Sequence, residues 1–129
     1  MQTPLPVLLV DADDVDREMI QRLLQPYASR FSVTAVPDAE RAFLLLRSTH
    51  TYFAIIVLEL ILPGIDGFEF LHFLRYQSAL KDSPVIVITG SNNERDRLQA
   101  EHYQIAGYFL KDTLESDAIS LIQLLHTFK

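Results

Sequence analysis

Short, continuously apolar segments alternate along the chain with longer segments in which apolar residues recur every three or four positions. The short segments predict five buried β-strands, at Leu5–Val10, Phe31–Val36, Phe53–Leu58, Val85–Ile88 and Gly107–Leu110. The periodic segments predict five amphipathic helices, which begin near residues 13, 37, 66, 92 and 114, the last two running to about residues 103 and 128. Strands that are apolar throughout are typical of a parallel sheet covered by helices on both faces.

Strands and helices alternate in regular succession, so each strand is joined to the next by a helical crossover. Because such crossovers are right-handed, they favour three layers, with helices on both sides of the sheet. We therefore predict an α/β fold, a flavodoxin-like three-layer α/β/α sandwich with a five-stranded parallel sheet in the order 2-1-3-4-5 and five helices. At 129 residues the chain is expected to form a single domain, residues 1–129, without internal repeats.

The apolar stripe of each helix predicts which of its residues face the sheet. The stripe of the first helix comprises Val15, Met19, Ile20, Leu23 and Leu24. In the last helix the stripe comprises Ala118, Leu121, Ile122 and Leu125. Further apolar residues extend around this last helix, namely Leu114, Ile119, Leu124 and Phe128. The wider apolar surface has two explanations, a broad core face or a surface that binds another protein.

Composition and charge exclude several classes of protein. Apolar residues make up 49% and charged residues 22% of the chain, which is ordinary for a folded globular protein. The net charge of -6 disfavours a nonspecific nucleic-acid surface, and the absence of cysteine excludes disulfides and thiolate chemistry. No apolar segment is long enough to span a membrane and no signal peptide is evident, so we expect a cytoplasmic location.

Polar and charged side chains follow four of the predicted strands, at the ends where parallel strands meet at one edge of the sheet. Asp11 and Asp13 follow the first strand, Glu59 the third, Thr89 the fourth and Lys111 the fifth. In the predicted strand order these loops surround one crevice, and open α/β sheets bind their ligands at that edge. Carboxylates suit Mg²⁺, whereas a hydroxyl and an ammonium suit a phosphoryl group.

The acids after the first strand have a second explanation, because acidic residues near a helix start are favourable in any protein. For Asp11 and Asp13 this explanation competes with a residual cation site that includes Glu59. For Asp14 and Asp16, stabilisation of the helix start is the only role that we expect.

Four segments carry a more specific signal, and they occur in the same order as in one known family. They are Val7–Asp11, Leu62–Gly67, Pro84–Gly90 and Ala106–Lys111. With these segments the chain resembles the response-regulator receiver domain of two-component signalling over nearly its whole length. The resemblance implies a non-enzymatic signalling domain in a phosphorelay, in which a sensor kinase transfers a phosphoryl group to an aspartate and the domain then contacts an effector.

The phosphoacceptor position departs from the family pattern, because the family's aspartate aligns with Glu59. The switch threonine, the switch aromatic residue and the lysine of the family are retained as Thr89, Tyr108 and Lys111. The proline that follows this lysine in the family is Asp112 here. The resemblance therefore implies an atypical receiver, or pseudo-receiver, in which phosphoryl transfer does not occur.

The metal site departs from the family pattern as well. The family has two adjacent acids after its first strand, and here the first is Asp11 while the second is replaced by Ala12. The resemblance implies that Asp11, Asp13 and Glu59 are the remaining candidates for a Mg²⁺ site. Since Ala12 provides no ligand, we expect Mg²⁺ binding to be weak or absent.

Three explanations of Glu59 remain open. Its longer side chain could mimic an acyl phosphate and hold Thr89 and Lys111 in the activated arrangement. It could instead mark a degenerate site on a folded scaffold. Phosphorylation of Glu59 itself is disfavoured, because an extra methylene misplaces the attacking oxygen and errors of about 1 Å are costly.

Other classes of protein share parts of this pattern. A conventional phosphorylatable receiver could use the residual acids. A phosphohydrolase of the haloacid-dehalogenase type has an Asp-x-Asp motif after its first strand, which Asp11 and Asp13 match locally. A small flavin-binding electron carrier has the same strand order, but the acids of residues 11–14 would repel its phosphate.

The resemblance also implies partners. We expect a sensor kinase or a downstream effector, and a homodimer through the face formed by the helix 92–103, the strand 107–110 and the helix 114–128. We expect no direct contact with nucleic acid or membrane. The identity of the kinase and effector, the oligomeric state and the presence of an output domain do not follow from the sequence.

Overall fold

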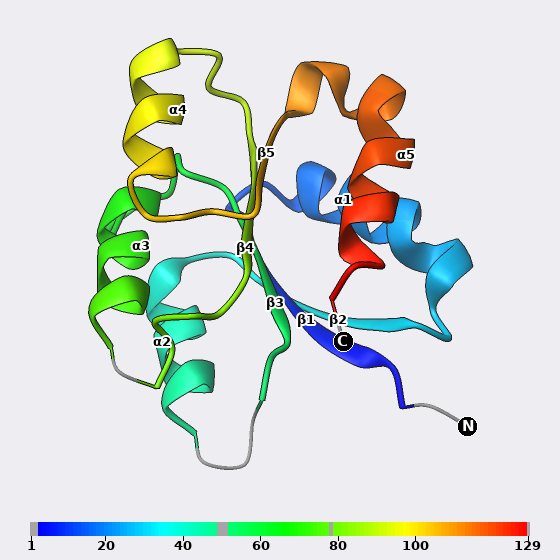
Figure 1. Cartoon of the computed structure of the whole chain (residues 1–129), viewed down its shortest axis with the longest axis horizontal. Helices are drawn as coiled ribbons and strands as arrows, with labels where there is room; N and C mark the ends of the chain where they lie inside the picture. Colours follow the sequence, from blue (N-terminus) through cyan, green and yellow to red (C-terminus); the bar gives the residue numbers. More distant parts are fainter. Residues whose placement is uncertain (1–2, 49–51, 78, 129) are drawn as a thin grey trace.

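The computed structural model describes residues 3–48, 52–77 and 79–128. In this part of the chain five parallel strands form one sheet in the order β2-β1-β3-β4-β5, which confirms the predicted flavodoxin-like topology (Figure 1). The strands are β1 (Leu5–Val10), β2 (Phe31–Val36), β3 (Ile55–Leu58), β4 (Val85–Thr89) and β5 (Gly107–Leu110). The helices are α1 (Asp14–Leu24), α2 (Ala39–Arg47), α3 (Gly67–Tyr76), α4 (Glu94–Glu101) and α5 (Leu114–Leu125).

Two hydrophobic cores cover the two faces of the sheet. Successive residues of a strand point to opposite faces, so Leu8 and Val10 pack on the side of α2, α3 and α4. Val7 and Leu9 pack on the other side, against α1 and α5. Figure 1 shows this division, with α2, α3 and α4 on one side of the strands and α1 and α5 on the other. Burial on both faces explains why the strands are apolar throughout.

Four helices begin with a polar side chain that accepts backbone N–H groups of the first turn. Asp13 caps α1, Asp38 caps α2 and Asn93 caps α4. Asp66 and Glu69 form a reciprocal capping box at the start of α3. Each such cap contributes about 1 kcal/mol, and together they fix where the loops at the carboxyl edge of the sheet enter the helices.

Several predicted boundaries and one predicted face differ from the structure. β3 begins at Ile55 instead of residue 53, α4 covers only Glu94–Glu101, and α5 ends at Leu125. Val15 was assigned to the apolar stripe of α1, but 69% of its surface is exposed. Leu114, one of the apolar residues beyond the predicted core stripe of α5, is fully buried, which at this position favours the broad core face over a binding surface.

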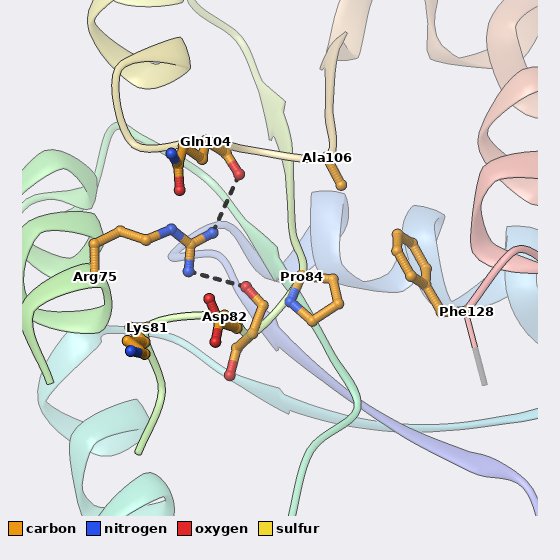
Figure 2. A pocket seen from close by; sticks show the side chains of 8 residues that line it. Arg75, Lys81, Asp82, Pro84, Gln104, Ala106 and Phe128 are labelled. Carbon is orange, nitrogen blue, oxygen red and sulfur yellow. Dashed lines mark hydrogen bonds between the residues drawn. The ribbon is translucent and has the colours of Figure 1, made fainter. Parts of the chain in front are cut away.

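At the amino edge of the sheet, the side chain of Arg75 joins α3 to two loops. Its Nε donates to the carbonyl oxygen of Tyr103 at 2.5 Å, and its Nη1 donates to that of Ser83 at 2.9 Å. Its Nη2 donates to the carbonyl oxygen of Gln104 at 3.5 Å. Arg75, Pro84 and Phe128 are among the residues that line a pocket of about 280 Å³. Figure 2 shows the guanidinium of Arg75 reaching from α3 towards Gln104 and Pro84. Because all three acceptors are backbone atoms, we interpret Arg75 as a structural clamp.

Candidate functional site

Four side chains named from the sequence meet at the carboxyl edge of the sheet. Asp11 follows β1, Glu59 follows β3, Thr89 ends β4 and Lys111 follows β5. Backbone bonds hold the first two in place, since Asp11 N–H donates to Val36 at 3.1 Å and Glu59 N–H donates to the carbonyl of residue 10 at 2.9 Å. Asp11, Glu59 and Thr89 are all buried. The strand order thus brings together groups that are far apart in sequence.

The Glu59 carboxylate receives donors on both oxygens. Its Oε1 accepts the backbone N–H of Ile61 at 2.9 Å and a short hydrogen bond from the Thr89 hydroxyl. Its Oε2 accepts the backbone N–H of Gly90 at 3.2 Å and lies 2.7 Å from Lys111 Nζ. A hydroxyl, two backbone amides and an ammonium therefore converge on one buried carboxylate, which compensates the loss of its hydration.

The Asp11 carboxylate is held less completely. Its Oδ1 accepts the backbone N–H of Asp13 at 3.0 Å. Its Oδ2 forms an ion pair with Lys111 Nζ at 2.8 Å. Among the described residues, none donates a hydrogen bond to this oxygen with acceptable geometry. Burial raises the pKa of Asp11. The ammonium of Lys111 and the backbone N–H of Asp13 oppose this effect, whereas the charge of Glu59 reinforces it. Asp11 is thus the less compensated of the two buried acids.

The ammonium of Lys111 lies between three carboxylates. Its Nζ is 2.8 Å from Asp11 Oδ2, 2.7 Å from Asp16 Oδ2 and 2.7 Å from Glu59 Oε2. Burial lowers the pKa of Lys111, but the bonds to these three carboxylates outweigh it, and the net pKa is raised. Lys111 therefore remains protonated at neutral pH.

Asp16 was missed as a site residue, since the sequence suggested only that it stabilises the start of α1. The structure shows that Asp16, Ile20 and Leu24, which are four residues apart, lie on the inward side of α1. Val15 precedes Asp16 by about 100° of helix rotation and is therefore exposed. The signal that could have identified Asp16 is its spacing from the two buried residues.

Asp13 and Ala12 leave little for a divalent cation to bind. The Asp13 side chain caps α1, since its Oδ1 accepts the N–H groups of Val15 at 2.9 Å and Asp16 at 3.0 Å. Ala12 has no ligand atom. Within the described ranges, no group of three or more histidine or acidic side chains is arranged to hold a metal ion. The donor set therefore fits a divalent cation poorly, because an ammonium already lies between the acids.

Tyr108 is linked to Thr89 through the loop that follows β4. The Tyr108 hydroxyl donates to the carbonyl oxygen of Ser91 at 3.1 Å, and Ser91 N–H donates to Thr89 Oγ1 at 3.1 Å. Burial raises the pKa of Tyr108. Ser91 also donates its hydroxyl to Asp96 Oδ2 of α4 at 2.5 Å. The bonds on Glu59 are thus continuous with those that position the start of α4.

Gly67 allows α3 to begin close to the loop that carries Glu59. A Cβ at Gly67 would lie 2.4 Å from the Cα of Leu60 and 2.8 Å from the carbonyl oxygen of Glu59. These atoms belong to the backbone and cannot move aside, so this position requires glycine. Gly64, with φ of 69°, supplies the left-handed turn in the same loop.

The predicted dimer face exposes two large apolar side chains. Leu98 of α4 is 52% exposed and Ile119 of α5 is 73% exposed. Arg97 lies beside Leu98 in sequence and pairs with Glu94 at 2.5 Å and Glu101 at 3.1 Å within α4. Since those ion pairs lie within one helix, they leave the mixed charges of α4 largely balanced.

In the described part of the chain, none of the helices is long and apolar enough to cross a bilayer.

Comparison with known proteins identifies the family. The family model of the response regulator receiver domain matches residues 7–123. The response regulator Rre1 of Synechocystis sp. (strain ATCC 27184 / PCC 6803 / Kazusa) is 29% identical over 123 residues, which cover 95% of this chain and 51% of that protein. The chain thus spans about half the length of this curated relative.

Two crystal structures are similar over most of the fold. The phosphorylated cyanobacterial phytochrome response regulator RcpA has a TM-score of 0.82 and 27% identity, covering 92% of this chain and 89% of that chain. The Mn²⁺-bound form of the response regulator Rcp1 has a TM-score of 0.81 and 26% identity, covering 93% of this chain and 90% of that chain.

Proposed function

Because the chain belongs to the response regulator receiver domain family of two-component signalling, we propose that it transmits signals through protein contacts without being phosphorylated. In this proposal Glu59 permanently occupies the position at which a typical receiver carries its phosphoryl group. One observation carries the proposal, namely that the Thr89 hydroxyl, the Gly90 amide and the Lys111 ammonium all bind the Glu59 carboxylate.

These three donors are the kind that recognise phosphoryl oxygens. In a receiver with a shorter acid they would be free to bind an incoming phosphoryl group. Here the longer side chain of Glu59 already engages them, which supports the view that it mimics the modified acid. The bonds from Thr89 to the loop of Ser91, and from that loop to Tyr108, connect this state to the start of α4.

Phosphoryl transfer to Glu59 is disfavoured by the same contacts. An attacking carboxylate oxygen must be accessible and unencumbered, whereas Glu59 is 4% exposed and both of its oxygens accept two donors. Mg²⁺ would also be held weakly or not at all, because Ala12 offers no ligand and Asp13 caps α1. The engagement of Asp13 in that cap argues against the phosphohydrolase alternative too.

The proposal is tested by incubating the protein with acetyl phosphate and Mg²⁺ and measuring the intact mass. We expect no added phosphoryl group on the wild type. The double variant Glu59→Asp/Ala12→Asp restores both family acids, and we expect it to gain a hydroxylamine-labile phosphoryl group. Stoichiometric labelling of the wild type would refute the proposal.

Output is proposed to pass through contacts with a sensor kinase or an effector. The exposed side chains of Leu98 and Ile119 support a contact surface on the face formed by α4, β5 and α5. If this face forms a homodimer, Ile119→Lys should shift the mass measured by light scattering from dimer to monomer. If the wild type is a monomer at high concentration, the homodimer is ruled out and this face would bind a different protein.

A further inference from the structure

The three carboxylates around Lys111 come from three different elements. Asp11 follows β1, Asp16 lies in the first turn of α1 and Glu59 follows β3. Lys111 Nζ lies within 2.8 Å of one oxygen from each of these three carboxylates. The ammonium is therefore surrounded by three carboxylates of the protein.

We infer that the ammonium of Lys111 acts as a built-in cation and that Asp16 positions it. This arrangement takes the place of the divalent cation expected in a typical receiver pocket. The inference concerns the same pocket as the proposed function and extends it to the question of how the pocket's charge is balanced. It rests on the positions of the four charged groups and assigns Asp16 a role that its place at a helix start does not require.

A metal ion would have to displace the ammonium to reach these oxygens. Three oxygens that surround one nitrogen atom also surround one common centre, and carboxylate oxygens are the ligands that hard divalent cations prefer. Removing the ammonium should therefore convert the pocket into a cation site. The wild-type pocket, with Lys111 in place, should bind such ions poorly.

Asp16 contributes differently from the two buried acids. Its side chain is 30% exposed, whereas the side chains of Asp11 and Glu59 are 2% and 4% exposed. Asp16 thus closes the solvent side of the ammonium, and without it Lys111 would be open to water on that side. Asp14 is a matched control, because it is an exposed acid in the same helical turn and is not among the carboxylates paired with Lys111.

The positioning role of Asp16 can be tested by brief labelling of intact protein with acetic anhydride, followed by peptide mass spectrometry. Lys81 is exposed and provides the reference within each sample. We expect Lys111 of the wild type to react far more slowly than Lys81. Asp16→Asn should accelerate labelling of Lys111 several-fold relative to Lys81, whereas Asp14→Asn should leave the ratio unchanged. A purely structural role at the helix start would affect both variants alike.

The built-in cation can be tested by Mn²⁺ binding, measured from the loss of the free-ion signal in electron paramagnetic resonance. We expect Lys111→Met to bind Mn²⁺ where the wild type and Lys81→Met do not. Adding Asp16→Asn to Lys111→Met should weaken that binding by about tenfold or more, because one oxygen ligand is removed.

Two results would overturn the inference. One is a wild type that binds Mn²⁺ as tightly as Lys111→Met, and the other is Lys111 labelling that does not change in Asp16→Asn. The labelling experiment stands alone if Lys111→Met fails to fold. Phosphorylation of the wild type would refute the proposed function, whereas Mn²⁺ binding without phosphorylation would refute only this inference.

Discussion

Lys111→Met should be strongly destabilising, because the pocket would then contain two buried carboxylates without a cation. Glu59 would keep the hydroxyl of Thr89 and two backbone amides, but Asp11 would keep only one backbone N–H. Breaking a buried ion pair by removing one partner costs about 3–5 kcal/mol. Since Asp11 and Glu59 are almost completely buried, we expect a loss of this size in the free energy of unfolding at pH 7.

The measurement is urea denaturation followed by far-ultraviolet circular dichroism, with Lys81→Met as the matched control at an exposed site. The control should stay within about 0.5 kcal/mol of the wild type. At pH 4 the difference between Lys111→Met and wild type should shrink, because the orphaned Asp11 carboxylate, whose pKa is raised by burial, can take up a proton. A Lys111→Met variant within about 1 kcal/mol of wild type at pH 7 would refute the claim that the ammonium offsets buried charge.

The pKa of Lys111 gives the wild type a characteristic loss of stability at high pH. The folded-state pKa is raised above the ordinary value of 10.5, so the folded protein holds this proton more tightly than the unfolded chain. The resulting stabilisation is complete below pH 10.5 and is lost as pH rises from there towards the folded-state pKa. Lys111→Met should lack this part of the pH dependence.

Two further predictions concern the scaffold of the site. Arg75→Met should lower the free energy of unfolding by about 2–4 kcal/mol in urea denaturation, because three backbone carbonyls lose a charged donor. Arg22→Met at an exposed position should have little effect, and equal losses would contradict the clamp. Gly67→Ala should cost about 2 kcal/mol or more by the same measurement, because its Cβ would collide with Leu60. Gly90→Ala, where a Cβ has nothing within 4 Å, should be tolerated, and similar costs would contradict the steric argument.

Much of the fold could be predicted because burial on both faces leaves a direct mark on the sequence. β1 and β2 have the predicted bounds, since each is limited by polar residues or a turn. β3 is shorter than predicted at its start, because an apolar run does not show where strand pairing begins. The phase of α1 was predicted less well, because Val15, Met19 and Leu23 repeat every four residues just as Asp16, Ile20 and Leu24 do.

The meeting of Asp11, Glu59, Thr89 and Lys111 could be predicted from strand order alone, because parallel strands end at the same edge. The way in which their atoms share donors could not. An acid at a helix start is favourable in any protein, and the spacing of Asp16 from Ile20 and Leu24 was matched by that of Val15 from Met19 and Leu23, so the sequence alone did not assign Asp16 to the pocket. Its role depends on the rotation of α1, which only the packed structure defines.

The distribution of donors around Glu59 suggests how signalling would work if the proposed function holds. A switch based on Thr89 needs a partner that is present in one state and absent in the other. Glu59 is always present, so the equilibrium cannot be set by adding a phosphoryl group. It would have to be shifted by a molecule that binds alternative arrangements of the loop after β4, which contains Ser91, with different affinity. A protein that contacts α4 or β5 is suited to this role, because Ser91 in the loop is hydrogen-bonded to Asp96 of α4 and to Tyr108 of β5.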